Sequence, residues 1–177
     1  MSLDKQPFSI DQMTGAANFI GAIHYHVHEQ KHFTCTDIDL DVDASAPKEW
    51  LIKTPSNPIR VHFVSSIITS VAAQVYFYEG VTVSSTGTEL PIWNNDRSSG
   101  VSSNVKWYKD PTVTDYGTQL DVQWIPGEKV GKIGAVSRPQ TEWILKPDEQ
   151  YLIRVIPEFD NAKVSVVIEF YELEVGS

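Results

Sequence analysis

The clearest pattern of apolar and polar positions lies near the C-terminus, between Trp143 and Glu174. Two runs separated by Asp160 and Asn161 have an apolar residue at every second position: Tyr151, Ile153 and Val155, then Val164, Val166, Ile168 and Phe170. A period of two is typical of a half-buried strand, and Asp and Asn tolerate the left-handed conformations of hairpin loops. The stretch therefore predicts a β-hairpin, which needs a second layer of structure to be stable.

The same period occurs near the start of the chain. In one run, three histidines at alternate positions are separated by apolar residues: Ile23, His24, Tyr25, His26, Val27 and His28. In a second run, four aspartates alternate with apolar residues: Asp37, Ile38, Asp39, Leu40, Asp41, Val42 and Asp43. Both runs predict strands with one apolar face and one polar face.

Further short strands are predicted at Glu49–Thr54, Gln74–Tyr78, Ser102–Tyr108 and Thr118–Ile125, separated by turns rich in Gly, Pro, Asn and Asp. No long segment has the 3.6-residue period of an amphipathic helix, and no internal repeat is evident. The pattern predicts an all-β fold, an antiparallel sandwich of the jelly-roll or Greek-key kind. We expect an N-terminal arm at residues 1–21, one sandwich domain at 22–177, and a mobile loop from Pro126 to Arg138.

Composition narrows the choice of partners. The chain of 177 residues has 14 Lys and Arg against 23 Asp and Glu, a net charge of -9. An acidic surface repels phosphate backbones, so we expect no nucleic-acid partner. The apolar runs are shorter than the roughly 20 residues of a membrane helix, and the N-terminus lacks the basic start and apolar core of a signal peptide. Cys35 is the only cysteine, so an intrachain disulfide is impossible.

The histidine run is the first candidate for chemistry. On a strand, His24, His26 and His28 would project from one face, and imidazoles spaced in this way can bind a transition metal. A cupin-like metal-dependent enzyme is therefore one alternative, although the second histidine motif of that family is absent downstream. A polar strand face, solvated or packed in a subunit contact, is the favoured interpretation, so we predict no metal and no cofactor.

The aspartate run has the look of a calcium loop but departs from its pattern. Val42 stands where an EF-hand loop requires Gly, and Lys48 stands where it requires Glu. Four carboxylates on one strand face repel each other. We therefore expect this face to be solvated, with a basic partner surface as the second choice and a bound cation as the third.

The tryptophans divide into two groups. Trp50, Trp124 and Trp143 lie within alternating runs and are predicted to be core residues, whereas Trp93 and Trp107 flank a polar loop at Asn94–Gly100. The core is the favoured site for the second pair as well, but exposed tryptophans there could stack on sugars or anchor a protein contact. No Gly-x-Ser-x-Gly elbow occurs, and Cys35 is expected to be a buried apolar residue. We therefore predict that the protein is not an enzyme.

Several of these stretches together resemble a known family. They are IHYHVHEQKHF, VYFYEGVTVSSTGTELPIWNNDRSS, EWILKPDEQYLIRV and VSVVIEFYE, within about Ala22 to Glu172. They are similar to small virion proteins of tailed bacteriophages, the capsid decoration or auxiliary head proteins. The resemblance implies a β-sandwich subunit, commonly a trimer, that binds the major capsid protein on the outside of the head shell and clamps neighbouring capsomers. It implies synthesis in the host cytoplasm, a final place on the virion surface, and no catalytic residues.

The sequence therefore favours a structural virion protein over two alternatives, a glycan-binding module of a phage head or tail, and a cupin-like enzyme. For the glycan-binding alternative, Trp93, Trp107 and Tyr108 are the candidate residues. For the structural role, we expect contacts through the N-terminal arm and through long loops such as Trp93–Gly100 and Pro126–Arg138. The expected interface residues are Phe8, Ile10, Trp93, Asn95, Arg97 and Trp107.

Overall fold

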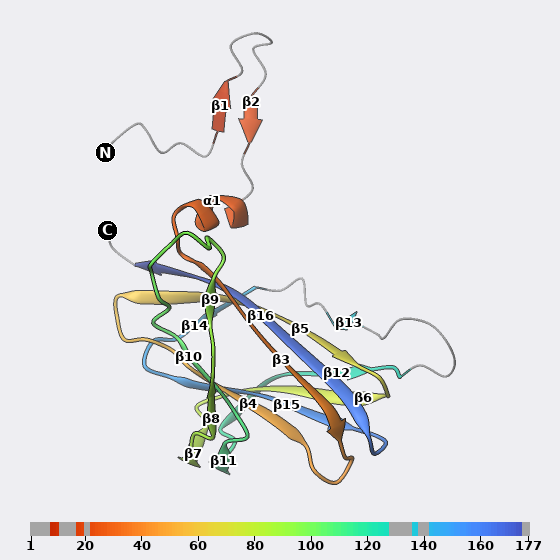
Figure 1. The fold of residues 1–177 in the computed structure, drawn as a ribbon. Coiled ribbons are helices and arrows are strands. Elements are labelled where there is room, and N and C mark those ends of the chain that lie inside the picture. Colours follow the sequence, from red (N-terminus) through yellow and green to blue (C-terminus); the bar gives the residue numbers. More distant parts are fainter. Residues whose placement is uncertain (1–7, 11–16, 20–21, 128–135, 138–141, 175–177) are drawn as a thin grey trace.

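The computed structural model describes residues 8–10, 17–19, 22–127, 136–137 and 142–174. Nearly all described elements are strands, and two antiparallel sheets are packed against each other (Figure 1). This confirms the predicted all-β sandwich. No helix among the described residues has the length and apolar character needed to cross a membrane.

Each large sheet has six strands. Sheet I has the order β12 (Thr118–Ile125), β6 (Ala73–Glu79), β15 (Gln150–Pro157), β4 (Lys48–Lys53), β10 (Lys106–Lys109) and β8 (Thr88–Leu90). Sheet II has the order β13 (Val136–Ser137), β5 (Ile59–Thr69), β16 (Ala162–Glu174), β3 (His32–Val42) and β9 (Trp93–Asn94), with β14 (Trp143–Leu145) also paired to β5. Both contain strands from early and late parts of the chain, so neither can form from one contiguous segment.

The two predicted C-terminal strands are confirmed as β15 and β16, but the predicted hairpin is wrong, because the strands lie in opposite sheets and do not pair with each other. Asn161 in the loop between them has a φ of 57°, the left-handed conformation expected there. Their predicted apolar faces are buried in the core between the sheets, together with Trp50 and Cys35. Burial raises the pKa of the Cys35 thiol, as expected for a cysteine that serves as an apolar core residue.

A second, smaller core lies on the other side of sheet I. The strands β7 (Thr82–Ser85) and β11 (Thr112–Asp115) pair with each other. Leu51 and Leu152 are fully buried in an apolar cluster that also contains Val81. This two-stranded sheet therefore covers part of the outer face of sheet I.

The predicted strand at Ile23–His28 is wrong, because Ala22–His28 forms the helix α1. Gln30, with a φ of 60°, ends the helix, and the amide of Lys31 donates a 3.0 Å hydrogen bond to the carbonyl of His26. A helix of seven residues is too short for intrinsic propensity to decide its conformation. Contacts with sheet II stabilise it instead, and these contacts do not leave a periodic signal in the sequence.

An internal repeat is present, contrary to the expectation from the sequence. Tyr78–Leu90 (repeat 1) and Tyr108–Leu120 (repeat 2) share the pattern Tyr-x3-Thr-Val-x3-Gly-Thr-x-Leu. Each repeat leaves sheet I, contributes one strand of the β7–β11 pair, and returns to sheet I through β8 or β12.

The predicted N-terminal arm contains a short hairpin of β1 (Phe8–Ile10) and β2 (Ala17–Phe19). Its register pairs Phe8 with Phe19 and Ile10 with Ala17. The side chains of the expected interface residues Phe8 and Ile10 lie outside the described part of the structure, as does most of the predicted loop from Pro126 to Arg138.

Candidate interaction face

The outer face of sheet II, which points away from sheet I, carries an unusual number of exposed apolar side chains. Of the ten large apolar side chains that are exposed among the described residues, five belong to this face: Ile38 (60%), Leu40 (60%), Ile68 (39%), Trp93 (53%) and Ile144 (63%). They come from four strands, β3, β5, β9 and β14. Concentrations of exposed apolar side chains of this kind mark sites of interaction with other molecules.

The strand pairings place two of these residues, Ile38 and Ile68, in one row across the sheet. Ile38 and Ile68 both pair with Ser165, and on the next row Thr36 and Ser66 both pair with Val167. These two rows contain only apolar and hydroxyl side chains. The exposed face of an antiparallel sheet is usually polar, so this region of sheet II is suited to contact with another apolar surface.

Ile38 and Leu40 are exposed because the alternating residues Asp37 and Asp39 point inward, toward sheet I. Phe33 and Cys35 are buried, and strand alternation carries the inward direction on to the two aspartates. The prediction that the aspartate row is a solvated face is therefore wrong for these two residues. Alternation alone shows that a strand has two faces, but not which of them is buried.

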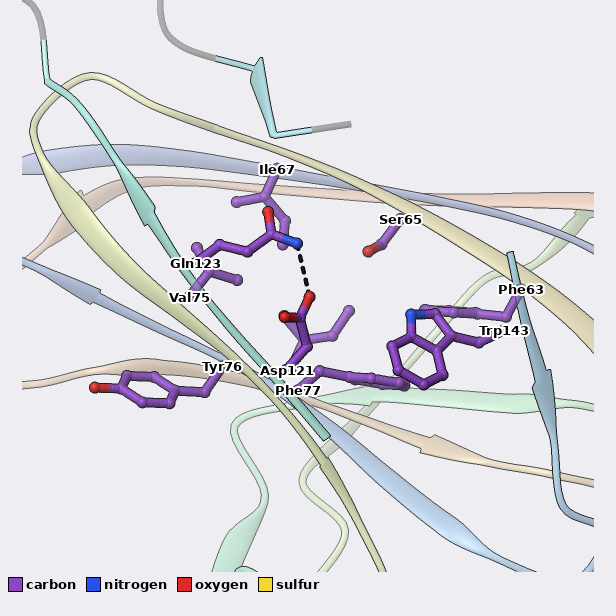
Figure 2. A pocket seen from close by; sticks show the side chains of 10 residues that line it. Phe63, Ser65, Ile67, Val75, Tyr76, Phe77, Asp121, Gln123 and Trp143 are labelled. Carbon is purple, nitrogen blue, oxygen red and sulfur yellow. Dashed lines mark hydrogen bonds between the residues drawn. The ribbon is translucent and has the colours of Figure 1, made fainter. Parts of the chain in front are cut away.

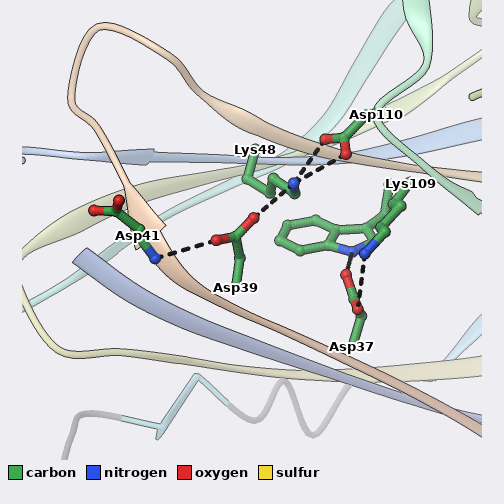
Figure 3. Close-up of polar contacts among 7 residues, drawn as sticks. Asp37, Asp39, Asp41, Lys48, Lys109 and Asp110 are labelled. Carbon is green, nitrogen blue, oxygen red and sulfur yellow. Dashed lines mark hydrogen bonds and ion pairs between the residues drawn. The ribbon is translucent and has the colours of Figure 1, made fainter. Parts of the chain in front are cut away.

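Specific partners stabilise the two inward carboxylates (Figure 3). Asp37 accepts a 2.9 Å hydrogen bond from the indole Nε1 of Trp50 and lies 3.8 Å from the Nζ of Lys109. Asp39 lies 2.7 Å from the Nζ of Lys48, which also lies 2.8 Å from Asp110. The carboxylates therefore link β3 of sheet II to β4 and β10 of sheet I.

These contacts change the acidity of the groups. The hydrogen bond from Lys48 lowers the pKa of Asp39 below its usual value, against the opposing effect of burial. Burial alone would lower the pKa of Lys48, but the hydrogen bonds to Asp110 and Asp39 outweigh it and raise the pKa. Both groups are therefore charged at neutral pH.

A β-bulge ends the section of β3 in which aspartates face inward and apolar residues face outward. Asp39 pairs with Val164 and Val42 pairs with Ala162, so β3 has one more residue than β16 between the two pairs. The extra residue reverses the faces of the strand, and Val42 is buried again.

The loop after β9 positions Trp93 at the edge of the face. The side chain of Asn95 accepts a 2.8 Å hydrogen bond from Thr34 and donates one of 2.8 Å to Nδ1 of His32. Burial lowers the pKa of His32, which favours the neutral ring that can accept this bond. Asn94 donates a 2.8 Å hydrogen bond to the carbonyl of Gln30. These hydrogen bonds of Asn94 and Asn95 fix the chain next to Trp93. The guanidinium of Arg97 lies 4.9 Å from the centre of the Trp93 ring.

The other expected interface residues and tryptophans have different surroundings. Trp107 has no exposed surface and is a core residue, so it is not available to a partner. Trp124, predicted to be in the core, is 59% exposed on the outer face of sheet I, and Trp143 packs against the main core as predicted.

The strand β12, like β3, has polar side chains on its inner face and apolar side chains on its outer face. Asp121 and Gln123 line a small cavity between the sheets and are joined by a 2.7 Å hydrogen bond (Figure 2), whereas Val122 and Trp124 are exposed. The cavity holds about 20 Å³, which is room for about one water molecule. It is therefore too small for a substrate.

The histidines of α1 do not form the predicted row. His24 and His28 lie one turn apart with their Nε2 atoms 3.0 Å from each other. The ring of His26 instead stacks on Tyr171, with 4.2 Å between ring centres. Among the described residues, no group of three or more His, Cys, Asp or Glu side chains is arranged to hold a metal ion.

Tyr171 connects α1 to sheet II. Its ring also stacks on His62, with 4.5 Å between ring centres, and Glu142 accepts hydrogen bonds of 2.5 Å from both residues. Burial lowers the pKa of His26, and the nearby charges of Lys31, His32 and His62 add to this effect. Burial opposes ionisation of Glu142, but the hydrogen bonds from Tyr171 and His62 lower its pKa overall. The cluster therefore holds the helix with a neutral His26.

Comparisons with protein-family models, with curated proteins and with solved structures found no match for this chain. The surface chemistry is then the basis for a functional proposal. Its main elements are the exposed apolar side chains on the outer face of sheet II, an exposed tryptophan on β9 at the edge of that sheet, and an acidic region beside β3.

Proposed function

We propose that this protein is a structural virion protein, a decoration subunit that binds the outside of a phage head shell and stabilises contacts between capsomers. The observation that carries the proposal is the concentration of exposed apolar side chains on the outer face of sheet II. The resemblance of the sequence to auxiliary head proteins supports the same role. In this proposal, the face lies against the major capsid protein, with Trp93 at its edge.

The energy available from this face bears on the number of subunits. Burying the remaining exposed part of each of the five side chains contributes about 1 kcal/mol, or roughly 5 kcal/mol together. Loss of translational and rotational freedom opposes binding by about 4–15 kcal/mol. A single subunit would therefore bind weakly, whereas an oligomer that contacts several capsomers gains from multivalency. This favours a homo-oligomer, and we propose a trimer.

The test is co-sedimentation of the purified protein with head shells assembled from the major capsid protein of the same genome. A double variant, Ile38→Lys with Ile68→Lys, places two charges in the centre of the face and should reduce binding at least tenfold. A matched variant, Val122→Lys with Trp124→Lys on sheet I, should bind as well as the unaltered protein. Unaltered protein that stays in the supernatant, or equal loss in both variants, would overturn the proposal.

Light scattering after size-exclusion chromatography tests the proposed oligomer separately. A mass of about three chains is expected for the free protein or for the protein released from shells. A monomer in both samples would contradict the multivalent mode of attachment, because one face supplies too little binding energy.

Glycan recognition is a second candidate, and the surroundings of Trp93 favour it. The indole is exposed, the guanidinium of Arg97 lies over its ring, and Asn95 in the following loop is held by hydrogen bonds to Thr34 and His32. Exposed aromatic rings beside polar groups stack on sugars. Trp107 is buried and Tyr108 packs against the second core, so Trp93 is the remaining residue of the expected set. Binding on a glycan array that Trp93→Ala abolishes and Trp124→Ala preserves would support this function, and an array without signal would exclude it.

A further inference from the structure

The edge of β3 is open over most of its length. On one side β3 pairs with β16 from Val42 to His32. On the other side β9 pairs with it only at Phe33 and Thr34. Within the described part of the chain, no strand pairs with residues 35–42 on that side. The unpaired backbone groups of an edge strand can accept a further strand from another molecule.

The two faces of this edge have different chemistry. On the outer side, Ile38 and Leu40 are each 60% exposed. On the inner side lies an open hollow of about 230 Å³, lined by Asp39, Asp41, Asp43, Asp110 and Lys48 with three small or apolar residues. Four carboxylates and one ammonium group give the lining a formal charge of -3.

An added strand must match both faces. Residues on a strand point alternately to the two sides, so the residues beside Ile38 and Leu40 should be apolar, and those directed at the hollow should be basic. A second β3 would fit poorly, because it would bring its own aspartates opposite these carboxylates, and like charges in opposing positions destabilise a strand pair. The charges therefore exclude a second β3 as the occupant.

We infer that the open edge of β3 binds an extended segment of a partner protein in which Lys or Arg alternates with aliphatic residues. The segment adds to sheet II as a further strand before the β-bulge, with its basic side chains directed at the acidic hollow. This inference does not depend on the proposed attachment to a phage head.

The probe is a labelled synthetic peptide with strict Lys/Val alternation, measured by fluorescence anisotropy and by amide hydrogen exchange. The peptide should bind in low salt and slow the exchange of amides in residues 35–42, whereas a Glu/Val peptide and a Lys/Val peptide with a central proline should not. Failure of the Lys/Val peptide to bind, or binding without protection of these amides, overturns the inference.

Variants then separate strand addition from general attraction to an acidic protein. Asp41→Lys with Asp43→Lys changes two exposed residues, which favours retention of the fold, and should weaken binding at least tenfold. Asp115→Lys with Glu158→Lys makes the same change in net charge at exposed sites away from β3 and should weaken binding less than threefold. Equal loss in the two variants would overturn the inference. Thermal unfolding of each variant verifies that the fold is retained, and Leu40→Lys provides an independent second test on the apolar side of the edge.

Discussion

Repeat 1 and repeat 2 have similar backbones but different surroundings. Gly87 and Gly117 have φ values of 80° and 65°, and the equivalent residues Gly80 and Asp110 also have positive φ. The amide of Gly80 donates to the carbonyl of Gln150 at 2.9 Å, and that of Asp110 donates to Glu49 at 3.0 Å. The shared residues are thus those that set the path of the backbone.

At positions where the two repeats differ in sequence, the side chains contact neighbours that are present beside only one of the repeats. Tyr116 of repeat 2, where repeat 1 has Thr86, donates a 2.7 Å hydrogen bond to Glu49 and lies under the guanidinium of Arg154. Lys109 and Asp110 contact the carboxylates and ammonium group beside β3. In repeat 1, Glu79 instead accepts a 2.6 Å hydrogen bond from Lys146. The comparison shows that a repeated backbone can be kept while its side chains are used for separate attachments.

The largest expected effect is in the small core below the two repeats, where Leu51 pairs directly with Leu152. Both side chains are fully buried below β7 and β11. We expect Leu51→Ala and Leu152→Ala each to lower the free energy of unfolding by about 3–5 kcal/mol, because each leaves a cavity. Urea unfolding measures this, with the exposed Val122→Ala as a control that should change stability by less than about 0.5 kcal/mol. Leu51 pairs with Tyr108 of repeat 2 and Leu152 pairs with Tyr78 of repeat 1, so a twofold larger effect at one leucine would show that the repeats do not pack equivalently on sheet I.

The next effect concerns the shared glycines. A Cβ at Gly87 would lie 2.1 Å from the carbonyl oxygen of Lys109, and one at Gly117 would lie 2.3 Å from that of Glu79. Each substitution by Ala should destabilise the fold by about 2–4 kcal/mol, from the clash and the positive φ together. Gly80→Ala is the matched control, because its φ is 75° but no atom lies within 4 Å, so about 1 kcal/mol is expected. Equal effects at all three glycines would show that backbone conformation alone matters.

A smaller effect distinguishes the two repeats. Tyr116→Phe removes the hydrogen bond to Glu49 and should lower stability by about 1 kcal/mol. Thr86→Val at the equivalent position of repeat 1 should change it by less than about 0.5 kcal/mol. Chemical unfolding of both variants would test this, and a larger loss for Thr86→Val would contradict the role given to Tyr116.

The smallest effect depends on pH. The pKa values of Asp39 and Glu79 are lowered, chiefly by hydrogen bonds from Lys48 and Lys146 respectively. Stability from a depressed carboxyl pKa is complete above the unfolded-state value of about 4 and is lost as the pH falls through the lower folded-state value. Asp39→Asn should therefore destabilise the protein at pH 7 by about 0.5–1 kcal/mol, and by less at pH 3. A difference that grows on acidification would contradict this assignment.

The sequence predicted the parts of the fold that depend on local pattern and turn chemistry. The alternation from Tyr151 to Phe170 and the left-handed Asn161 are examples, and the buried Trp50 follows from the same reasoning. The repeat is difficult to detect because only six of its thirteen positions are identical, although the spacing of Gly87 and Gly117 behind Thr-Val pairs is a usable signal.

The candidate interaction face could not be predicted, because alternation does not determine which face of a strand is buried. Ile38, Leu40 and Trp124 are exposed where a hydrophobic pattern favours the core. The cause for β3 is long-range: Lys48, Trp50 and Lys109 provide inward partners for its carboxylates. Among the expected interface residues whose side chains the structure describes, Trp93 and Arg97 are exposed and Asn95 is half-buried, although the core is the favoured site of Trp93 in the sequence.

The strand pairings of the repeats link the two parts of sheet I. The end of repeat 1 pairs with β10, where repeat 2 begins, and the end of repeat 2 pairs with β6, where repeat 1 begins. Each repeat therefore ends in a strand that pairs with the strand in which the other repeat begins. If the chain were cleaved between the two repeats, these strand pairings would still hold the fragments together. Lengthening the exposed turns of the repeats would leave the pairings unchanged.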